Sequence, residues 1–221
     1  MTKEEYIRKM EEDEEWAPRW DAIDDEFSRL YPNQEPSHYA TNILDRAWIG
    51  AGGNEYLDGY SIYRNPDGYF HIVTYGMTEL YQDPDAFGKE YSRWGYEMTM
   101  KVKENSQEDC LWVLGVMGNL ARYTFQSERY FEAGHFVAGN GTSLHNDTDF
   151  KITGLVIVHD TSAKTQNTIH GKVEFLQLVG ITTQEVAALR ADINNVEKLI
   201  ALMKKDNPEL ITDIKRDFDY L

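Results

Sequence analysis

The chain has 221 residues, and its 41% hydrophobic and 13% aromatic content is typical of a packed globular protein and not of a disordered one. Asp and Glu number 38 against 22 Lys and Arg, which gives a formal net charge of −16. Phosphate binding needs a cationic surface, so this charge argues against a nucleic-acid ligand. A basic protein partner and simple solubility would both suit it. The single cysteine, Cys110, excludes disulfides and cysteine-based zinc sites within one chain.

The absence of sorting signals in the sequence predicts a cytoplasmic protein. The longest apolar runs, such as Leu155–Val158, are far shorter than the ~20 residues that a membrane span requires. The first 16 residues carry acidic side chains where a secretory signal would need an apolar core. We therefore expect neither a membrane partner nor export.

The N-terminal part of the chain divides into an acidic segment, residues 1–24, and a domain over residues 25–221. We expect the acidic segment to be a helix or tail that the fold does not need, because charge-dense chain ends usually fray. Aromatic and aliphatic residues with spacings of three and four indicate one face of a helix. They are Trp16, Trp20, Ile23, Phe27 and Leu30. Residues 31–36 contain two prolines and predict a turn.

Alternation of side chains predicts β-strands in the middle of the chain. Residues 56–64 and 69–76 flank Asn65–Gly68, whose proline and glycine are typical of a turn, so the three segments predict an antiparallel hairpin. A loop over residues 81–95 then leads to a third strand over residues 97–103.

The second half of the chain alternates between helical and strand patterns. Residues 108–128 predict a helix that lies across the sheet. Further strands are expected over residues 135–140, 152–159 and 172–181. The capping-box pattern Thr182–Glu185 predicts the start of a helix over residues 183–205, and residues 210–214 are expected to form a last short strand. The predicted fold class is α+β, with a mostly antiparallel or mixed sheet of six or more strands flanked by helices, including a long helix near the C-terminus.

We find no motif for catalysis or metal binding in the sequence. Gly50–Gly53 lacks the spacing of a phosphate-binding loop and predicts a tight turn. The six histidines form neither an HExxH motif nor a pair at i, i+4. Glu108 and Asp109 next to Cys110 are expected to raise the thiol pKa and keep it inert. We predict a protein that is not an enzyme and has no cofactor; an uncharacterised hydrolase or cofactor enzyme is the alternative, because catalytic groups can converge from distant residues.

Several segments closely resemble the amino-terminal domain of the Suppressor of fused family. They are YSIYRN (60–65), YGMTELY (75–81), GYEMTMKVK (95–103), LARYTFQSE (120–128) and VEFLQLVGITTQE (173–185). RLYPNQEP (29–36) and ELITDIKR (209–216) also resemble that family's first and last segments. The resemblance covers roughly residues 25–221 in unbroken order.

The resemblance implies a protein that works by binding another protein. The family's animal members have a second domain and hold a short extended segment of a zinc-finger transcription factor between their two domains; nothing in this sequence corresponds to the second domain. Stand-alone copies occur mainly in bacteria and are associated with polymorphic-toxin loci. The resemblance therefore implies a bacterial immunity protein, a monomer or weak homodimer, that neutralises a toxin, and the net charge would suit a basic toxin. A cytoplasmic regulatory scaffold unrelated to toxins is the alternative.

The resemblance also implies a partner-binding site at Tyr123, Phe131 and His135. In the animal proteins, the segment that follows the match to residues 120–128 helps to line the groove for the partner. Tyr123 and Phe131 could equally be core aromatics, and the sequence leaves both readings open. The family has an Asp between the residues that match Gly134 and His135, and its lack here argues against the transcription-factor mode of binding.

Overall fold

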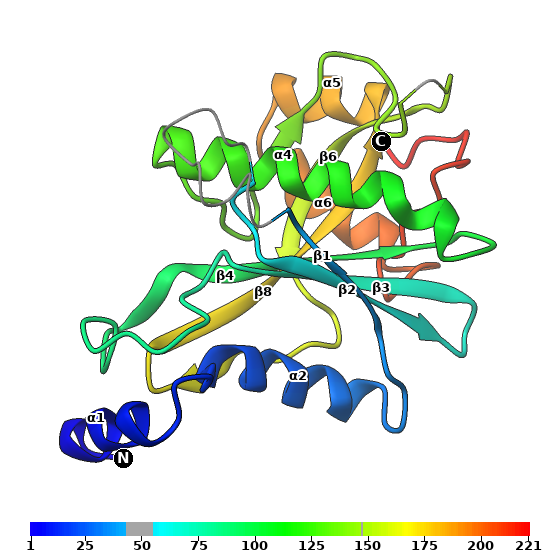
Figure 1. Cartoon of the computed structure of the whole chain (residues 1–221). Coiled ribbons are helices and arrows are strands. Elements are labelled where there is room, and N and C mark those ends of the chain that lie inside the picture. Colours follow the sequence, from blue (N-terminus) through cyan, green and yellow to red (C-terminus); the bar gives the residue numbers. More distant parts are fainter. Residues whose placement is uncertain (43–54, 147) are drawn as a thin grey trace.

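The computed structural model describes residues 1–42, 55–146 and 148–221, and it confirms the α+β class (Figure 1). The predicted glycine turn at residues 50–53 lies outside these residues. The described residues form eight strands, which are β1 (Ser37–Ala40), β2 (Gly59–Asn65), β3 (Tyr69–Tyr75), β4 (Tyr91–Val102), β5 (Phe136–Ala138), β6 (Ile152–His159), β7 (Gln166–Thr168) and β8 (Gly171–Thr182). The helices are α1 (Lys3–Glu12), α2 (Pro18–Leu30), the 3-10 turn η1 (Glu108–Cys110), α4 (Leu111–Ser127), α5 (Thr183–Ala191) and α6 (Asn195–Met203). No helix in the described part of the chain is long and apolar enough to cross a membrane.

The strands form one mixed sheet in the order β1-β2-β3-β4-β8-β6-β5, and β7 pairs with β8 outside this path. The predicted hairpin is confirmed, because β2 and β3 pair antiparallel from Gly59↔Tyr75 to Asn65↔Tyr69. In its turn, Gly68 has a φ of +90°, a conformation that favours glycine. The central strands β4 and β8 pair in parallel, and this pairing makes the sheet mixed.

The strand predicted from residue 97 in fact begins at Tyr91, inside the segment expected to be a loop. Between the pairs Tyr91↔Lys172 and Tyr96↔Glu174, four residues of β4 lie opposite one residue of β8. Arg93 and Gly95 within this bulge have φ values of +49° and +83°. A bulge interrupts the alternation of side chains, so a period of two could not reveal this part of the strand.

Helices cover both faces of the sheet, and Figure 1 shows α2 and α4 on opposite sides of it. The predicted helix over residues 108–128 is confirmed as η1 followed by α4, whose Val113 and Met117 pack on one face together with Leu176 and Leu178 of β8. The side chains of β8 that alternate with Leu176 and Leu178 point to the opposite face of the sheet. There, Phe175 packs with α2, and Val179 packs with α5 and α6.

The single helix predicted over residues 183–205 is instead two helices, α5 and α6, although the capping box at its start is confirmed. At the end of α5, the backbone N–H of Asp192 donates to the carbonyl of Ala188. The Asp192 carboxylate accepts the backbone N–H of Asn194 at 3.0 Å. Asp and Asn side chains compete with the helix for backbone hydrogen bonds in this way. Ile193 is consequently 58% exposed, where one continuous helix would have turned it inward.

The C-terminal segment contains no last strand, because residues 210–214 make only an isolated bridge between Val102 and Thr212. The segment nevertheless covers the sheet between α2 and α6. The side chain of Gln177, between Phe175 and Val179 on β8, donates to the carbonyls of Glu209 and Leu210. These bonds satisfy a buried polar group in the middle of an otherwise apolar face.

The N-terminal segment packs more tightly than the sequence predicts. Residues 3–12 form α1, and Tyr6 on this helix is fully buried. The Tyr6 hydroxyl bonds to His170 Nε2 and accepts the backbone N–H of Asp83, both at 2.7 Å. The boundary predicted at residue 24 lies inside α2, so the division into tail and domain stays a prediction.

A candidate protein-binding face

The residues predicted to bind a partner lie together at one end of α4. The Tyr123 side chain is 44% exposed, which excludes the core reading for this residue. Its ring centroid lies 5.7 Å from that of Phe131, which is itself partly buried against the core. His135 follows just before β5, where its Nδ1 accepts the backbone N–H of Glu132 at 3.2 Å. The fold therefore brings Tyr123 and Phe131 together as a tilted aromatic pair, with Tyr123 exposed and Phe131 partly buried.

The bulge in β4 adds aromatic residues that the sequence analysis missed. Tyr91 and Trp94 of β4, together with Tyr130 and Phe131, line a pocket of about 540 Å³. Tyr91 is 46% exposed and Tyr130 is 56% exposed. We call the surface formed by Tyr91, Trp94, Tyr123, Tyr130 and Phe131 the aromatic face. Exposed tyrosines and tryptophans in one place are typical of protein-binding surfaces, because they bury a large area at a small entropic cost.

Rigid packing holds the aromatic face in place from below. The Trp94 ring meets Phe125 of α4 edge-on at 5.5 Å, and the Arg93 guanidinium lies 4.5 Å from the centre of the Phe125 ring. The Trp94 indole N–H is buried and has no hydrogen-bond acceptor among the described residues. The face is therefore anchored on α4 and β4 and needs little reordering to bind a partner.

The rim of the pocket beside the aromatic face carries both signs of charge. Glu132 and Glu174 line the pocket together with Arg93. Glu174 also forms an ion pair with Lys172, whose ammonium lies 5.6 Å from the centre of the Tyr91 ring. A mixed polar rim around an aromatic centre is the usual arrangement of a protein-binding surface.

A short edge strand lies next to this face. The strand order ends at β5, which pairs only with β6 among the described strands. The segment before it continues the pairing, since the N–H of Gly134 donates to Ile157 and the N–H of Ile157 donates to His135. An edge strand exposes backbone groups that can pair with an extended segment of another chain.

The other groups that the sequence analysis weighed for chemistry lie apart from this face. Among the described residues, no three His, Cys, Asp or Glu side chains come together in a way that could hold a metal ion. Cys110 is buried at the start of α4, and its Sγ donates to the carbonyl of Ser106 at 3.4 Å. Burial, supported by the charges of Glu104 and Asp109, raises the pKa of the Cys110 thiol to about 12.

We expect the Cys110 thiol to react with Ellman's reagent at pH 8 at least ~100-fold more slowly in the folded protein than in urea. A pKa of about 12 leaves very little of the reactive thiolate at this pH, and burial also blocks access. The change in absorbance at both conditions measures the two rates. Equal rates would show that the thiol is exposed and not inert.

Comparisons with known proteins identify the family. The family model described as "Suppressor of fused protein" matches residues 53–217. The human Suppressor of fused homolog is 31% identical over 213 residues, which cover 88% of this chain. The chain belongs to the Suppressor of fused family. The homolog from Mus musculus matches equally well, and the alignment spans 42% of the length of each of these two relatives.

Solved structures of the Suppressor of fused family share the fold. A chain in the crystal structure of a Sufu–Fu complex superposes with a TM-score of 0.79 at 23% identity, covering 92% of this chain and 93% of that one. Drosophila Suppressor of fused gives a TM-score of 0.77 at 24% identity, covering 92% of this chain and 51% of its own. A protein described as a homologue from Neisseria gonorrhoeae FA 1090 gives 0.59 at 13% identity, covering 89% and 93%.

Proposed function

We propose that this chain is a non-enzymatic protein that binds and inhibits a protein partner at the aromatic face. The observation that carries this proposal is that exposed Tyr91 and Tyr130 line one pocket, and that exposed Tyr123 lies against Phe131 of the same pocket. Covering water-exposed aromatic rings by a partner is favourable. Here Tyr91 stands on the central strand β4 and Tyr123 on the helix α4. The Sufu–Fu complex, whose crystal structure contains a similar chain, supports protein binding as the mode of action.

The partner would place an extended segment along β5 and an apolar side chain in the pocket beside Phe131. The edge of β5 offers backbone groups for pairing, and the pocket lies near the segment that leads into this strand. His135 would contribute from its half-exposed position. In this arrangement, backbone pairing would provide affinity and the aromatic pocket would select the side chain.

A toxin is the partner that we propose, with this chain as the bacterial immunity protein that neutralises it in the cytoplasm. The stand-alone family copies associated with toxin loci support this role, and the net charge of −16 suits a basic toxin. Opposite charges would speed association, whereas burial of the aromatic face would slow release. No catalysis by this chain is needed, because covering the toxin would be enough.

The toxin proposal is tested with the product of the reading frame next to this gene. We expect this product to stop bacterial growth when expressed alone and co-expression of the present chain to restore growth. The two purified proteins should form a complex in surface plasmon resonance, with slower association at higher salt. A neighbouring product that is harmless, or a toxin that this chain neither binds nor neutralises, would contradict the immunity role.

Tyr123→Ala and Phe131→Ala should each speed release of that partner about 30-fold, because a buried aromatic anchor contributes about 2 kcal/mol to binding. Leu111→Ala is the matched control, since Leu111 lies on the same helix α4 and is 41% exposed but belongs neither to the aromatic face nor to its pocket. Thermal unfolding of the same variants separates binding from stability. A variant that melts much earlier but binds normally would show that its side chain serves the core.

A further inference from the structure

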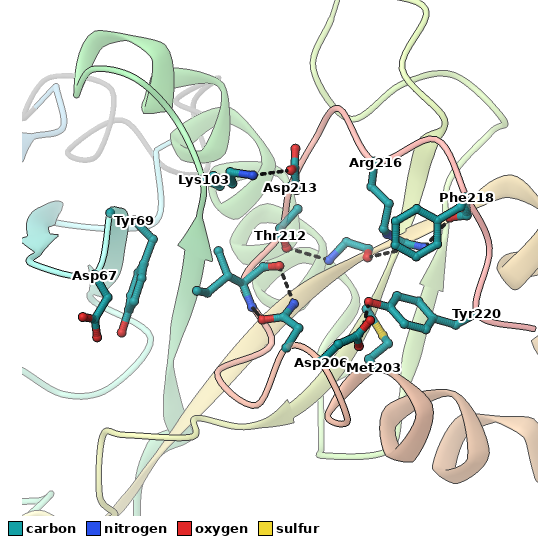
Figure 2. Close-up of a pocket in the computed structure, with 14 residues that line it drawn as sticks. Asp67, Tyr69, Lys103, Met203, Asp206, Thr212, Asp213, Arg216, Phe218 and Tyr220 are labelled. Atoms are coloured by element: carbon teal, nitrogen blue, oxygen red, sulfur yellow. Dashed lines mark hydrogen bonds and ion pairs between the residues drawn. The ribbon is translucent and has the colours of Figure 1, made fainter.

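A second pocket, of about 310 Å³, lies between the β2–β3 turn and the segment that follows α6. In Figure 2, Asp67 and Tyr69 stand on one side of it and Phe218 and Tyr220 on the other. Met203, which is 2% exposed, and Asp206 also line it. This volume is at the lower limit for ligand pockets and suits a single side chain better than a larger molecule.

The cations already present in this pocket are neutralised by the protein itself. Arg216 donates to both carboxylate oxygens of Glu185, at 2.8 and 2.7 Å. Its guanidinium also lies 5.0 Å from the centre of the Tyr220 ring and 5.6 Å from that of Phe218. Lys103 pairs with Asp213 at 3.1 Å, as Figure 2 shows. Neither cation is therefore free to attract an anion.

Two carboxylates in the pocket have no cation of their own. Asp67 and Asp206 form no ion pair with any residue that the structure describes, and Asp206 accepts only the Tyr220 hydroxyl, at 3.2 Å. Both line the same pocket as the rings of Tyr69 and Phe218, and Phe218 is 52% exposed. Tyr69 is buried, so the exposed ring is that of Phe218. Carboxylates that share a pocket with an exposed aromatic ring favour a cation with a flat apolar surface.

We propose that this pocket receives an arginine side chain of a protein partner. A guanidinium can stack on an aromatic ring and donate to a carboxylate at the same time, as Arg216 does here with Tyr220 and Glu185. The net charge of −16 favours a basic segment over an acidic one. The pocket thus binds one basic residue at a defined point.

This contact is separate from the aromatic face. Trp94 lies in the first half of β4, whereas Lys103 of the pocket directly follows the last residue of that strand. With a rise of about 3.3 Å per residue, the two sites lie on the order of 30 Å apart. The pocket is tested with a small probe, so the result does not depend on the partner proposed for the aromatic face.

The probe is N-acetyl-arginine methylamide, added to the full chain with 13C-labelled methionine methyl groups and followed by NMR. The Met203 resonance is assigned with Met203→Leu. We expect this resonance to move and to saturate with the arginine compound, because Met203 lines the pocket. N-acetyl-citrulline methylamide has nearly the same shape without the charge and should leave the resonance in place.

Asp67→Asn and Asp206→Asn should each weaken binding of the arginine probe about threefold, since an exposed ion pair contributes modestly. Asn at position 206 can still accept the Tyr220 hydroxyl, so the pocket keeps its shape. Glu197→Gln removes one exposed charge from α6 outside the pocket and should change nothing. Any of three results would overturn the proposal. The Met203 resonance could stay still with the arginine compound, or it could move equally with the citrulline compound. It could also respond unchanged in the Asp67→Asn, Asp206→Asn double variant.

Discussion

Asp160→Asn is expected to lower the free energy of unfolding by about 3–5 kcal/mol, the cost of breaking a buried charge pair. The Asp160 carboxylate is buried, and each oxygen accepts two hydrogen bonds. One oxygen accepts from His71 Nε2 at 2.9 Å and from the Thr99 hydroxyl, and the other accepts the backbone N–H groups of Ser162 and Ala163, both at 2.8 Å. An Asn amide would turn its own N–H groups toward donors on one of these sides.

The same carboxylate faces a buried cation. Lys101 lies 3.5 Å from Asp160 and also pairs with Glu209 in the C-terminal segment, at 2.5 Å. Asp160 thus helps to neutralise Lys101, whose ion pairs connect β4, the loop after β6 and the C-terminal segment. Loss of its negative charge leaves Lys101 with Glu209 as its one ion-pair partner among the described residues, and this contributes to the expected cost.

The effect of Asp160→Asn should depend on pH in a defined direction. Burial alone would raise the pKa of Asp160, but the facing His71 and Lys101 outweigh burial and hold it well below its usual range. A carboxyl with a lowered native pKa stabilises the fold above its unfolded pKa, and this contribution fades as the pH falls. The difference between wild type and Asp160→Asn should therefore shrink progressively below about pH 4.

Urea unfolding of both proteins between pH 7 and pH 3 measures these differences. Asp85→Asn is the control, because Asp85 is exposed and its carboxylate makes no hydrogen bond or ion pair with the described residues. An Asp160→Asn protein as stable as this control would show that the buried network contributes little to the fold.

Tyr6→Ala is expected to destabilise the protein by about 3 kcal/mol, as for other buried aromatic residues. The Tyr6 ring packs against Trp16 and Phe87, each at a centroid distance of 5.1 Å. Removal of residues 1–15 should cost a similar amount, because it deletes the same anchor. This prediction differs from the expectation that the acidic segment is dispensable, which rested on its charge and on the family resemblance that begins after it.

Two further variants separate the parts of this contact. Tyr6→Phe keeps the ring but leaves His170 Nε2 and the Asp83 N–H without their partner, at a cost of about 1 kcal/mol. Ile7→Ala is the control, since the neighbouring Ile7 is 40% exposed. Thermal and urea unfolding give the comparison. If Tyr6→Ala unfolds like Ile7→Ala, α1 does not stabilise the domain.

The sequence alone determined several local elements and the family. The β2–β3 hairpin followed from a turn motif between alternating segments, and the start of α5 followed from the capping box at Thr182. These features depend on residues that are close in the chain, so a sequence pattern contains them completely. The order of the matching segments was also sufficient to indicate the Suppressor of fused family.

Only the tertiary structure decided which residues meet. Tyr6 is buried because Asp83, Phe87 and His170 form its pocket, and nothing in the acidic sequence around Tyr6 indicates them. Tyr91 joins Phe131 because a bulge that breaks the strand alternation brings them to one pocket. In both cases the free energy comes from contacts between distant parts of the chain, which local spacing does not encode.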